Sequence, residues 1–239
     1  YILFKQSVES EIFDTFICAK PKVTEVIIPP FIKIINYACN EFLTQITIPS
    51  SVTLIGDYAF KGCSSLAQIT FEIPSSVTSI GDYAFERCNK LTKIVIPSSV
   101  TSIGYYAFSE CSELTQITIP SSITSIGKNA FENCNKLTQF VIPSYLTSIE
   151  INSFSECSEL TQITIPSSVA SIKNYSFYNC SSLAKITFLV PSSVTSIGGS
   201  AFSKCSKITQ ITIPSSVTSI EWCAFSGCSS LTKITIPSS

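Results

Sequence analysis

The chain has 239 residues, of which 45% are hydrophobic and 13% charged, with a net charge of −1 and no histidine. The chain has no excess of basic residues, which argues against nucleic-acid binding. It also has no run of about 18 apolar residues, which argues against a membrane span. Without histidine, Ser-His-Asp and Cys-His catalysis and histidine-ligated metal sites are excluded.

The first segment, residues 1–22, does not follow the pattern of the rest of the chain. It mixes charged residues with Ile12, Phe13, Phe16 and Ile17 at roughly helical spacing. We expect an N-terminal cap or a degenerate repeat that covers the first open edge of a core. The alternative is a docking element for a partner.

From residue 23 onward the sequence repeats. The prolines Pro74, Pro97, Pro120, Pro143 and Pro166 lie 23 residues apart. A fixed period of this length is typical of a solenoid, in which each unit packs only against its neighbours. Residues 23–239 therefore predict an array of nine to ten units. Two units carry a two-residue insertion, at 69–74 and 186–191.

Each unit predicts three short pieces of structure. Leu66, Ile69 and Phe71 end in period-two alternation, which indicates a strand with one face inward. The segment 52–55 is rich in β-formers and predicts a second short strand. The segment 57–63 resembles a single helical turn. We expect the stacked coils to form one parallel sheet, with short strands and helical turns on the other side.

Eight of the 11 cysteines fall in one column, one per unit, three residues after a phenylalanine. This register places them in the core, so we expect buried free thiols rather than disulfides or metal ligands. A thiol in such a place has no group that would lower its pKa, so catalysis is not expected. Cys18, Cys39 and Cys223 lie off or at the edge of this register, and Cys223 is the best candidate for an exposed thiol. The column is Cys63, Cys88, Cys111, Cys134, Cys157, Cys180, Cys205 and Cys228.

Equivalent residues of successive units should stack into columns on the surface. One outward column of the predicted strands is a candidate partner-binding face, because solenoids bind through such surfaces. It consists of Gln45, Gln68, Lys93, Gln116, Gln139, Gln162, Lys185, Gln210 and Lys233. A solvated sheet face is the other interpretation. In a second column Lys and Glu alternate over 90–159, which predicts ion pairs between neighbouring coils.

Four residues replace the usual polar residue of their column by a large apolar one: Tyr105, Tyr145, Ile151 and Trp222. Exposed aromatic residues are good candidates for binding hot spots, although tolerated drift would give the same departures. Asn174 and Asn179 stand in N-x-S sequons, which chance explains well in a serine-rich chain.

The repeat resembles a known family. Leu114, Ile117, Ile119 and Pro120, followed by Ile123, Ile126, Gly127, Ala130, Phe131 and Cys134, carry the likeness. This pattern is similar to the BspA-like, treponemal-type leucine-rich repeats of bacterial and protist surface proteins. Glu150, Lys173 and Glu221 depart from it, since they replace glycine. The resemblance implies a curved leucine-rich-repeat solenoid, frequent cell-surface location, adhesion or protein binding, and no catalytic residue.

The sequence therefore predicts an α/β solenoid that consists mostly of β-strands. We expect it to bind a host or self protein, and we expect neither enzyme activity nor a cofactor. A cell-surface or plasma-membrane-associated, adhesin-like protein is the first hypothesis. A cytoplasmic scaffold or regulatory subunit for a signalling enzyme, such as a protein phosphatase, is the alternative, and the free thiols favour it. Since the chain stops directly after a predicted strand, we expect a longer native protein or end-to-end pairing of two copies.

Overall fold

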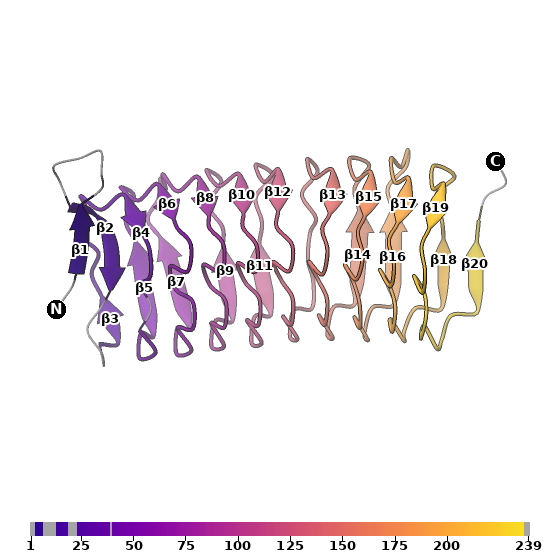
Figure 1. Ribbon diagram of the computed structural model, residues 1–239, viewed down its shortest axis with the longest axis horizontal. Helices are drawn as coiled ribbons and strands as arrows, with labels where there is room; N and C mark the ends of the chain where they lie inside the picture. Colours follow the sequence, from indigo (N-terminus) through magenta and orange to yellow (C-terminus); the bar gives the residue numbers. More distant parts are fainter. Residues whose placement is uncertain (1–2, 7–12, 19–22, 39, 237–239) are drawn as a thin grey trace.

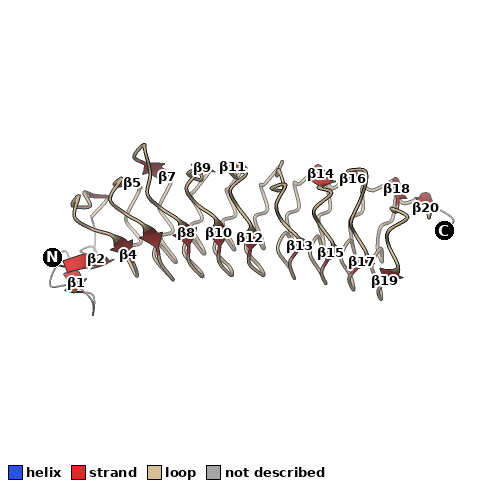
Figure 2. Ribbon diagram, turned by 90° about the horizontal axis from the view of Figure 1, so that it is seen from above, coloured by secondary structure: helices blue, strands red, loops and turns tan. Residues whose placement is uncertain are grey.

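The chain winds into a row of flat, similar coils that stack side by side along one axis (Figure 1). The structure, a computed structural model, describes residues 3–6, 13–18, 23–38 and 40–236. Most regular coils contribute one two-residue strand to one side and one longer strand to the other; the coil of Gln139 has only an isolated bridge, to Gln162, in place of the longer strand. The stack bows gently, with the longer strands along its outer side and the short strands along its inner side (Figure 2). The fold is the predicted curved solenoid.

The short strands are β4 (Ile34–Ile35), β6 (Leu54–Ile55), β8 (Ser79–Ile80), β10 (Ser102–Ile103), β12 (Ser125–Ile126), β13 (Ser148–Ile149), β15 (Ser171–Ile172), β17 (Ser196–Ile197) and β19 (Ser219–Ile220). From β8 to β17 each short strand has one buried isoleucine and one outward serine, whereas β4 and β6 carry Ile34 and Leu54 at the outward position. They pair in parallel and in register from coil to coil within two series, from β4 to β12 and from β13 to β19. Their pairing keeps the isoleucine column in the core.

The short-strand sheet is interrupted between β12 and β13. In the coil before the break, the Gly127 N–H still donates to the Ile103 carbonyl at 2.9 Å. A Cβ atom at Gly127 would lie only 2.6 Å from the carbonyl carbon of Gly104. Glu150 replaces glycine in this column at the break, although Asn36, Lys173 and Glu221 also replace it in coils whose short strands stay paired. Lys173 restores the ladder by donating to the Ile149 carbonyl at 2.9 Å.

The longer strands form several small parallel sheets instead of the one continuous sheet that the repeat predicts. The pairing stops between β7 and β9, between β11 and β14, and between β16 and β18. Two of these breaks follow the two-residue insertions, which let the strand diverge from the next coil. The strands are β3 (Glu25–Val26), β5 (Gln45–Ile48), β7 (Gln68–Phe71), β9 (Lys93–Val95), β11 (Gln116–Thr118), β14 (Gln162–Ile165), β16 (Lys185–Phe188), β18 (Gln210–Thr212) and β20 (Lys233–Thr235).

The N-terminal segment forms a hairpin, so the helical spacing over 12–17 was misleading. Strand β1 (Leu3–Gln6) pairs antiparallel with β2 (Phe13–Cys18), and β2 pairs in parallel with β4. The hairpin thus lies at the end of the short-strand sheet, in the place of a coil. Its alternating phenylalanine and polar residues suit a strand equally well, and an open sheet edge is there to pair with.

The predicted helical turn is also wrong, since each of these segments is a run of turns. In every regular coil two residues have a positive φ, which ends any helical hydrogen-bond pattern. The turn segments instead bond coil to coil: Phe85 N–H donates to Ala107 O at 2.7 Å, and Phe108 N–H donates to Ala130 O at 2.8 Å. One column of positive φ is Tyr37, Tyr58, Tyr83, Tyr106, Asn129, Asn152, Tyr175, Ser200 and Cys223.

The core lies between the two series of strands and consists of repeated columns. The phenylalanine column stacks face to face along the axis; Phe108 lies 5.1 Å from Phe85 and 5.5 Å from Phe131 between ring centroids. Leucine, isoleucine and cysteine columns fill the rest. Because each coil packs only on its neighbours, each ring is buried by the coils before and after it.

Candidate binding faces

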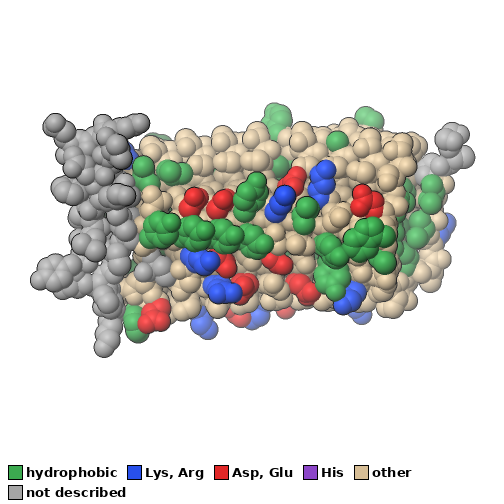
Figure 3. All heavy atoms as spheres, in the orientation of Figure 1, with side chains coloured by type: hydrophobic (Ala, Val, Ile, Leu, Met, Phe, Trp, Pro, Cys, Tyr) green, Lys and Arg blue, Asp and Glu red, His purple; other side chains and the backbone are tan. Residues whose placement is uncertain are grey.

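A ladder of tyrosines runs along the inner side of the molecule. The rings of Tyr37, Tyr58, Tyr83 and Tyr106 stack nearly parallel, with centroid separations of 5.5, 4.9 and 4.9 Å. All four side chains remain partly or largely exposed. The left-handed backbone at each of these positions turns the side chain outward, while the following Ala and Phe enter the core. Figure 3 shows hydrophobic side chains in a row on this side, with charged side chains above and below.

Charged residues fix the first part of this ladder. The Lys61 ammonium lies 5.3 Å and 4.7 Å from the ring centroids of Tyr58 and Tyr83, and it contacts Glu86 at 2.7 Å. A cation over a tyrosine ring is attracted by the electrons of the ring face. Arg87 forms a two-point contact with Glu110, at 3.0 and 3.1 Å. The ladder is therefore held in place by charges at its edge.

Carboxylates collect farther along the same side. The pKa of Glu132 is raised by its partial burial, against the hydrogen bond from Asn129, and by the neighbouring charges of Glu110 and Glu156. Burial and the Glu132 charge also raise the pKa of Tyr106. A hollow of about 430 Å³ lies next to this cluster, and Glu132, Glu156, Tyr175 and Tyr178 line it.

A second aromatic group continues this side toward the C-terminus. Tyr175 contacts Tyr178 and Trp222 edge-on, with centroid distances of 5.7 and 5.6 Å. The indole of Trp222 lies over Gly199, where a Cβ atom would approach the ring to 2.4 Å. Gly199 thus makes room for Trp222, which stays 55% exposed. The glycine stands where other coils carry Asp or Asn.

The predicted hot spots fall in different places. Tyr105 and Trp222 lie on the aromatic side and are 51% and 55% exposed, and Ile151, in the same column, is half-buried. Tyr145 is exposed on a different column, at a turn before β13, so the structure does not bring it together with the other three. No binding measurement bears on these residues, and they stay predictions.

The glutamine and lysine column lies on the outer side, at the first position of the longer strands. All nine residues, from Gln45 to Lys233, are exposed. In the Lys-Glu column, Lys136 and Glu113 form the predicted ion pair at 2.8 Å, and the hydrogen bond from Lys136 lowers the pKa of Glu113. Lys90 also attracts this carboxylate and lowers the same pKa less strongly. Such exposed pairs contribute little to stability.

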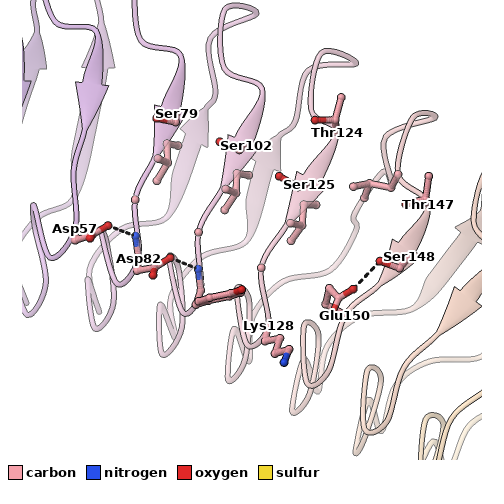
Figure 4. Close-up of a pocket in the computed structure, with 18 of the residues that line it drawn as sticks. Asp57, Ser79, Asp82, Ser102, Thr124, Ser125, Lys128, Thr147, Ser148 and Glu150 are labelled. Atoms are coloured by element: carbon pink, nitrogen blue, oxygen red, sulfur yellow. Dashed lines mark hydrogen bonds between the residues drawn. The ribbon is translucent and has the colours of Figure 1, made fainter.

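A shallow groove of about 680 Å³ crosses five coils on the inner side (Figure 4). The serines of β8, β10, β12 and β13 line it, together with Asp57, Asp82, Tyr105, Lys128 and Glu150. Its carboxylates join neighbouring coils: Asp57 accepts the N–H of Asp82 at 2.8 Å, and Asp82 accepts the N–H of Tyr105 at 2.7 Å. These contacts make the aspartates structural links of the stack rather than an acid–base pair.

The cysteine column is buried, as predicted. The eight thiols form no disulfide and are inaccessible or nearly so, whereas Cys223, also without a disulfide, is exposed. Each described hydrogen bond of these thiols follows one pattern, in which the thiol donates to the phenylalanine carbonyl of the preceding coil. Cys111, for example, donates to Phe85 O at 3.1 Å. Cys39 lies outside the described residues, as does the side chain of Cys18.

Because burial raises the pKa of Cys111 to about 12, we expect alkaline pH to destabilise the fold. Below pH 9, both folded and unfolded thiols keep their protons, and full stability is present. Above it, the unfolded state loses protons that the folded state retains, so the free energy of unfolding falls. Urea denaturation from pH 8 to 10.5 measures this slope. The Cys111→Ala variant should show a shallower slope, and equal slopes would contradict the prediction.

The sequon asparagines are engaged in contacts between coils. Asn174 accepts the N–H of Gly199 at 2.9 Å, and Asn179 donates to Glu156 at 2.6 Å. Across the described residues there is no group of three or more His, Cys, Asp or Glu placed to hold a metal ion. In the same part of the chain, no helix is long and apolar enough to cross a membrane.

The chain resembles known leucine-rich repeat proteins in sequence and in fold. Comparison with protein families matches residues 32–160 and 124–239 to the BspA type leucine rich repeat region, in 6 copies. A leucine-rich repeat protein from Bacteroides ovatus is 28% identical, with a TM-score of 0.80 over 99% of this chain and 70% of that chain. No curated protein matches.

Two further solved structures share the fold. The leucine-rich repeat protein of T. pallidum is 24% identical, with a TM-score of 0.57 over 87% of each chain. A leucine-rich repeat protein from Eubacterium ventriosum is 23% identical, with a TM-score of 0.52 over 88% of this chain and 84% of that chain. Since the family match extends over nearly all of residues 32–239, this chain belongs to the BspA-type leucine-rich repeat family.

Proposed function

We propose that the chain is a protein-recognition module whose partner docks on the aromatic side. The observation that carries this proposal is a pair of aromatic groups on one side of the molecule, the tyrosine ladder and the Tyr175, Tyr178 and Trp222 group, whose rings are partly or largely exposed. Tyrosine and tryptophan are enriched in protein interfaces because they bury a large area at a small cost in side-chain entropy. The surrounding charges would form the polar rim of such an interface.

We further propose an adhesin-like role at the cell surface. The resemblance to repeats of bacterial and protist surface proteins supports this location. An intracellular scaffold for a signalling enzyme is the competing function, and its support is the column of free thiols. An amine-reactive label that cannot cross membranes distinguishes the two on intact cells. Labelling of the chain supports the surface role, and labelling only after lysis supports the scaffold.

Tyr105 gives the strongest support for a binding role, as opposed to tolerated sequence drift, at these positions. In the preceding coil Asp82 accepts the N–H of Tyr105, and Asn174 does the same for Gly199. Tyrosine at position 105 has no side-chain carboxylate or amide to repeat this contact with the next coil. The chain thus gives up a link between coils and gains an exposed ring. A role in contacts outside the molecule explains this exchange.

The variant Tyr105→Asp tests the proposal. We expect it to fold with unchanged or slightly higher thermal stability, because a carboxylate can again accept an N–H from the next coil. Immobilised wild-type chain is used to capture proteins from extracts of candidate host or producing cells. We expect the double variant Tyr105→Asp/Trp222→Asn to lose proteins that the wild type retains. The matched control is Val141→Thr, a consensus replacement on the outer side, which should retain them.

If the double variant and the wild type capture the same proteins, the aromatic side is not the docking surface. If the control loses them as well, the outer side is required. Thermal denaturation of all three proteins shows whether a loss reflects unfolding.

A further inference from the structure

The two insertions create equivalent features on the outer side of the stack. Each lengthens the connection after a longer strand and stops the pairing of that strand with the next coil, after β7 and after β16. At both places the separated coils leave a groove, an apolar one of about 780 Å³ between β7 and β9 and one of mixed polarity of about 560 Å³ between β16 and β18. Phe71 and Val95 belong to the first region, and Phe188 and Val190 line the second.

A protruding apolar side chain stands in the lining of each groove, Ile73 in the first and Val190 in the second. Ile73 is 93% exposed and Val190 is 89% exposed, which is unusual for β-branched aliphatic residues. The loop after β7 rises above the row of longer strands in Figure 2. A knob and a groove therefore occur together, twice, on the same side of the molecule.

The positions of the two insertions are related by symmetry. The outward column of the longer strands contains ten residues when Glu25, which pairs with Gln45, is included. The insertions follow Gln68 and Lys185, the third and eighth of these positions. A two-fold axis through the middle of this face exchanges the third and eighth positions. Two antiparallel copies related by this axis bring the Ile73 insertion of one copy opposite the Val190 insertion of the other, so that apolar surface meets apolar surface at both places.

The charges along the face fit the same arrangement. Glu25 and Glu72 are exposed toward its N-terminal end, and Lys185 and Lys233 are exposed toward its C-terminal end. Antiparallel pairing brings the acidic end of one copy to the basic end of the other, whereas parallel pairing would oppose like charges. Lys93, nearer the middle, is the one further charge in the column.

We propose that two copies of this chain pair antiparallel through the outer side, with Ile73 of each copy against Val190 and the adjoining groove of the other. The outward bow leaves space between two such faces at their ends, and the protruding insertion loops extend into that space. Glutamine and threonine side chains of the strands form the polar remainder of the contact. The inner, aromatic side stays free for a different partner, so this pairing is independent of the proposed function.

Sedimentation velocity of the 239-residue chain over a range of concentrations tests the pairing. We expect a concentration-dependent dimer in the wild type. Ile73→Asp and Val190→Asp should each weaken it by about 30-fold or more, as expected for the loss of a central apolar anchor. Both side chains are exposed, so the variants should keep the wild-type circular dichroism and melting temperature.

Charge reversal tests the orientation. Glu72→Lys alone and Lys185→Glu alone should each weaken the dimer, and the double variant should restore it. Ile234→Asp, at the last coil, should leave it unchanged, as should Tyr105→Asp on the aromatic side. A wild type that stays monomeric at high concentration overturns the proposal. So does a dimer that only Ile234→Asp disrupts, since that result indicates end-to-end pairing instead.

Discussion

Replacing Phe108 by alanine is expected to lower the free energy of unfolding by about 3–5 kcal/mol, the range for a buried phenylalanine. The ring is fully buried and stacks on Phe85 and Phe131 at 5.1 and 5.5 Å. Its removal leaves a cavity that the neighbouring coils cannot fill, because their backbones are fixed by bonds on both sides of the stack. Urea denaturation followed by circular dichroism measures the effect.

The matched control for Phe108→Ala is Phe42→Ala, since Phe42 is 40% exposed. We expect it to cost less than about 1 kcal/mol, as for most surface changes. Because each coil depends on its neighbours, the loss at Phe108 should also reduce the cooperativity of unfolding. Equal losses in the two variants would show that the phenylalanine column does not determine stability.

The Gly127→Ala variant is expected to lose about 3 kcal/mol, at the upper end of the usual cost of overpacking. The added Cβ would lie 2.6 Å from both the Gly104 carbonyl carbon and the Tyr105 nitrogen. These are backbone atoms of a hydrogen-bonded coil, so no side-chain movement relieves the clash.

Gly62→Ala separates this crowding from backbone strain. Gly62 has a φ of +74° and no atom within 4 Å of an added Cβ, so the variant bears only the cost of the left-handed conformation. That cost is about 1 kcal/mol. Thermal and urea denaturation of both variants give the comparison. Equal losses would contradict the close approach of coils at the Gly127 column.

The repeat made most of the fold predictable. The period, the apolar columns and the cysteine register all follow from the side chains that must face the core. The interruptions of the sheets could not be predicted from the repeat, because they depend on whether the backbone of one coil lies close enough to form hydrogen bonds with the next coil. Glu150 and the two insertions were visible in the sequence as departures, but their effect on the ladder depends on distances between coils.

Local conformation was the weaker part of the prediction. The segment 57–63 has residues that suit a helical turn, yet positive φ values at Tyr58 and Gly62 rule one out. Tyrosine rarely adopts this conformation, so its presence in three successive regular coils was not expected from propensity. Bonds between coils, such as Tyr58 N–H to Asp82 O at 2.8 Å, outweigh the local preference.

The tyrosine ladder was missed, although the sequence carried a signal for it. Tyr58, Tyr83 and Tyr106 occupy one column in three successive regular units. Tyrosine is the commonest residue of this column, so these side chains do not stand out as departures from the repeat. Gly199 likewise stands one coil before Trp222 and could have indicated that the indole needs space.

Oxidative footprinting is the most direct test of binding through the aromatic side. Hydroxyl radicals modify exposed aromatic side chains, and mass spectrometry measures each one in the free chain and in the presence of a captured protein. We predict that Tyr58, Tyr83, Tyr106 and Trp222 become protected, while Phe42 keeps its reactivity. Protection of Phe42 with unchanged reactivity of the ladder and Trp222 would contradict the account.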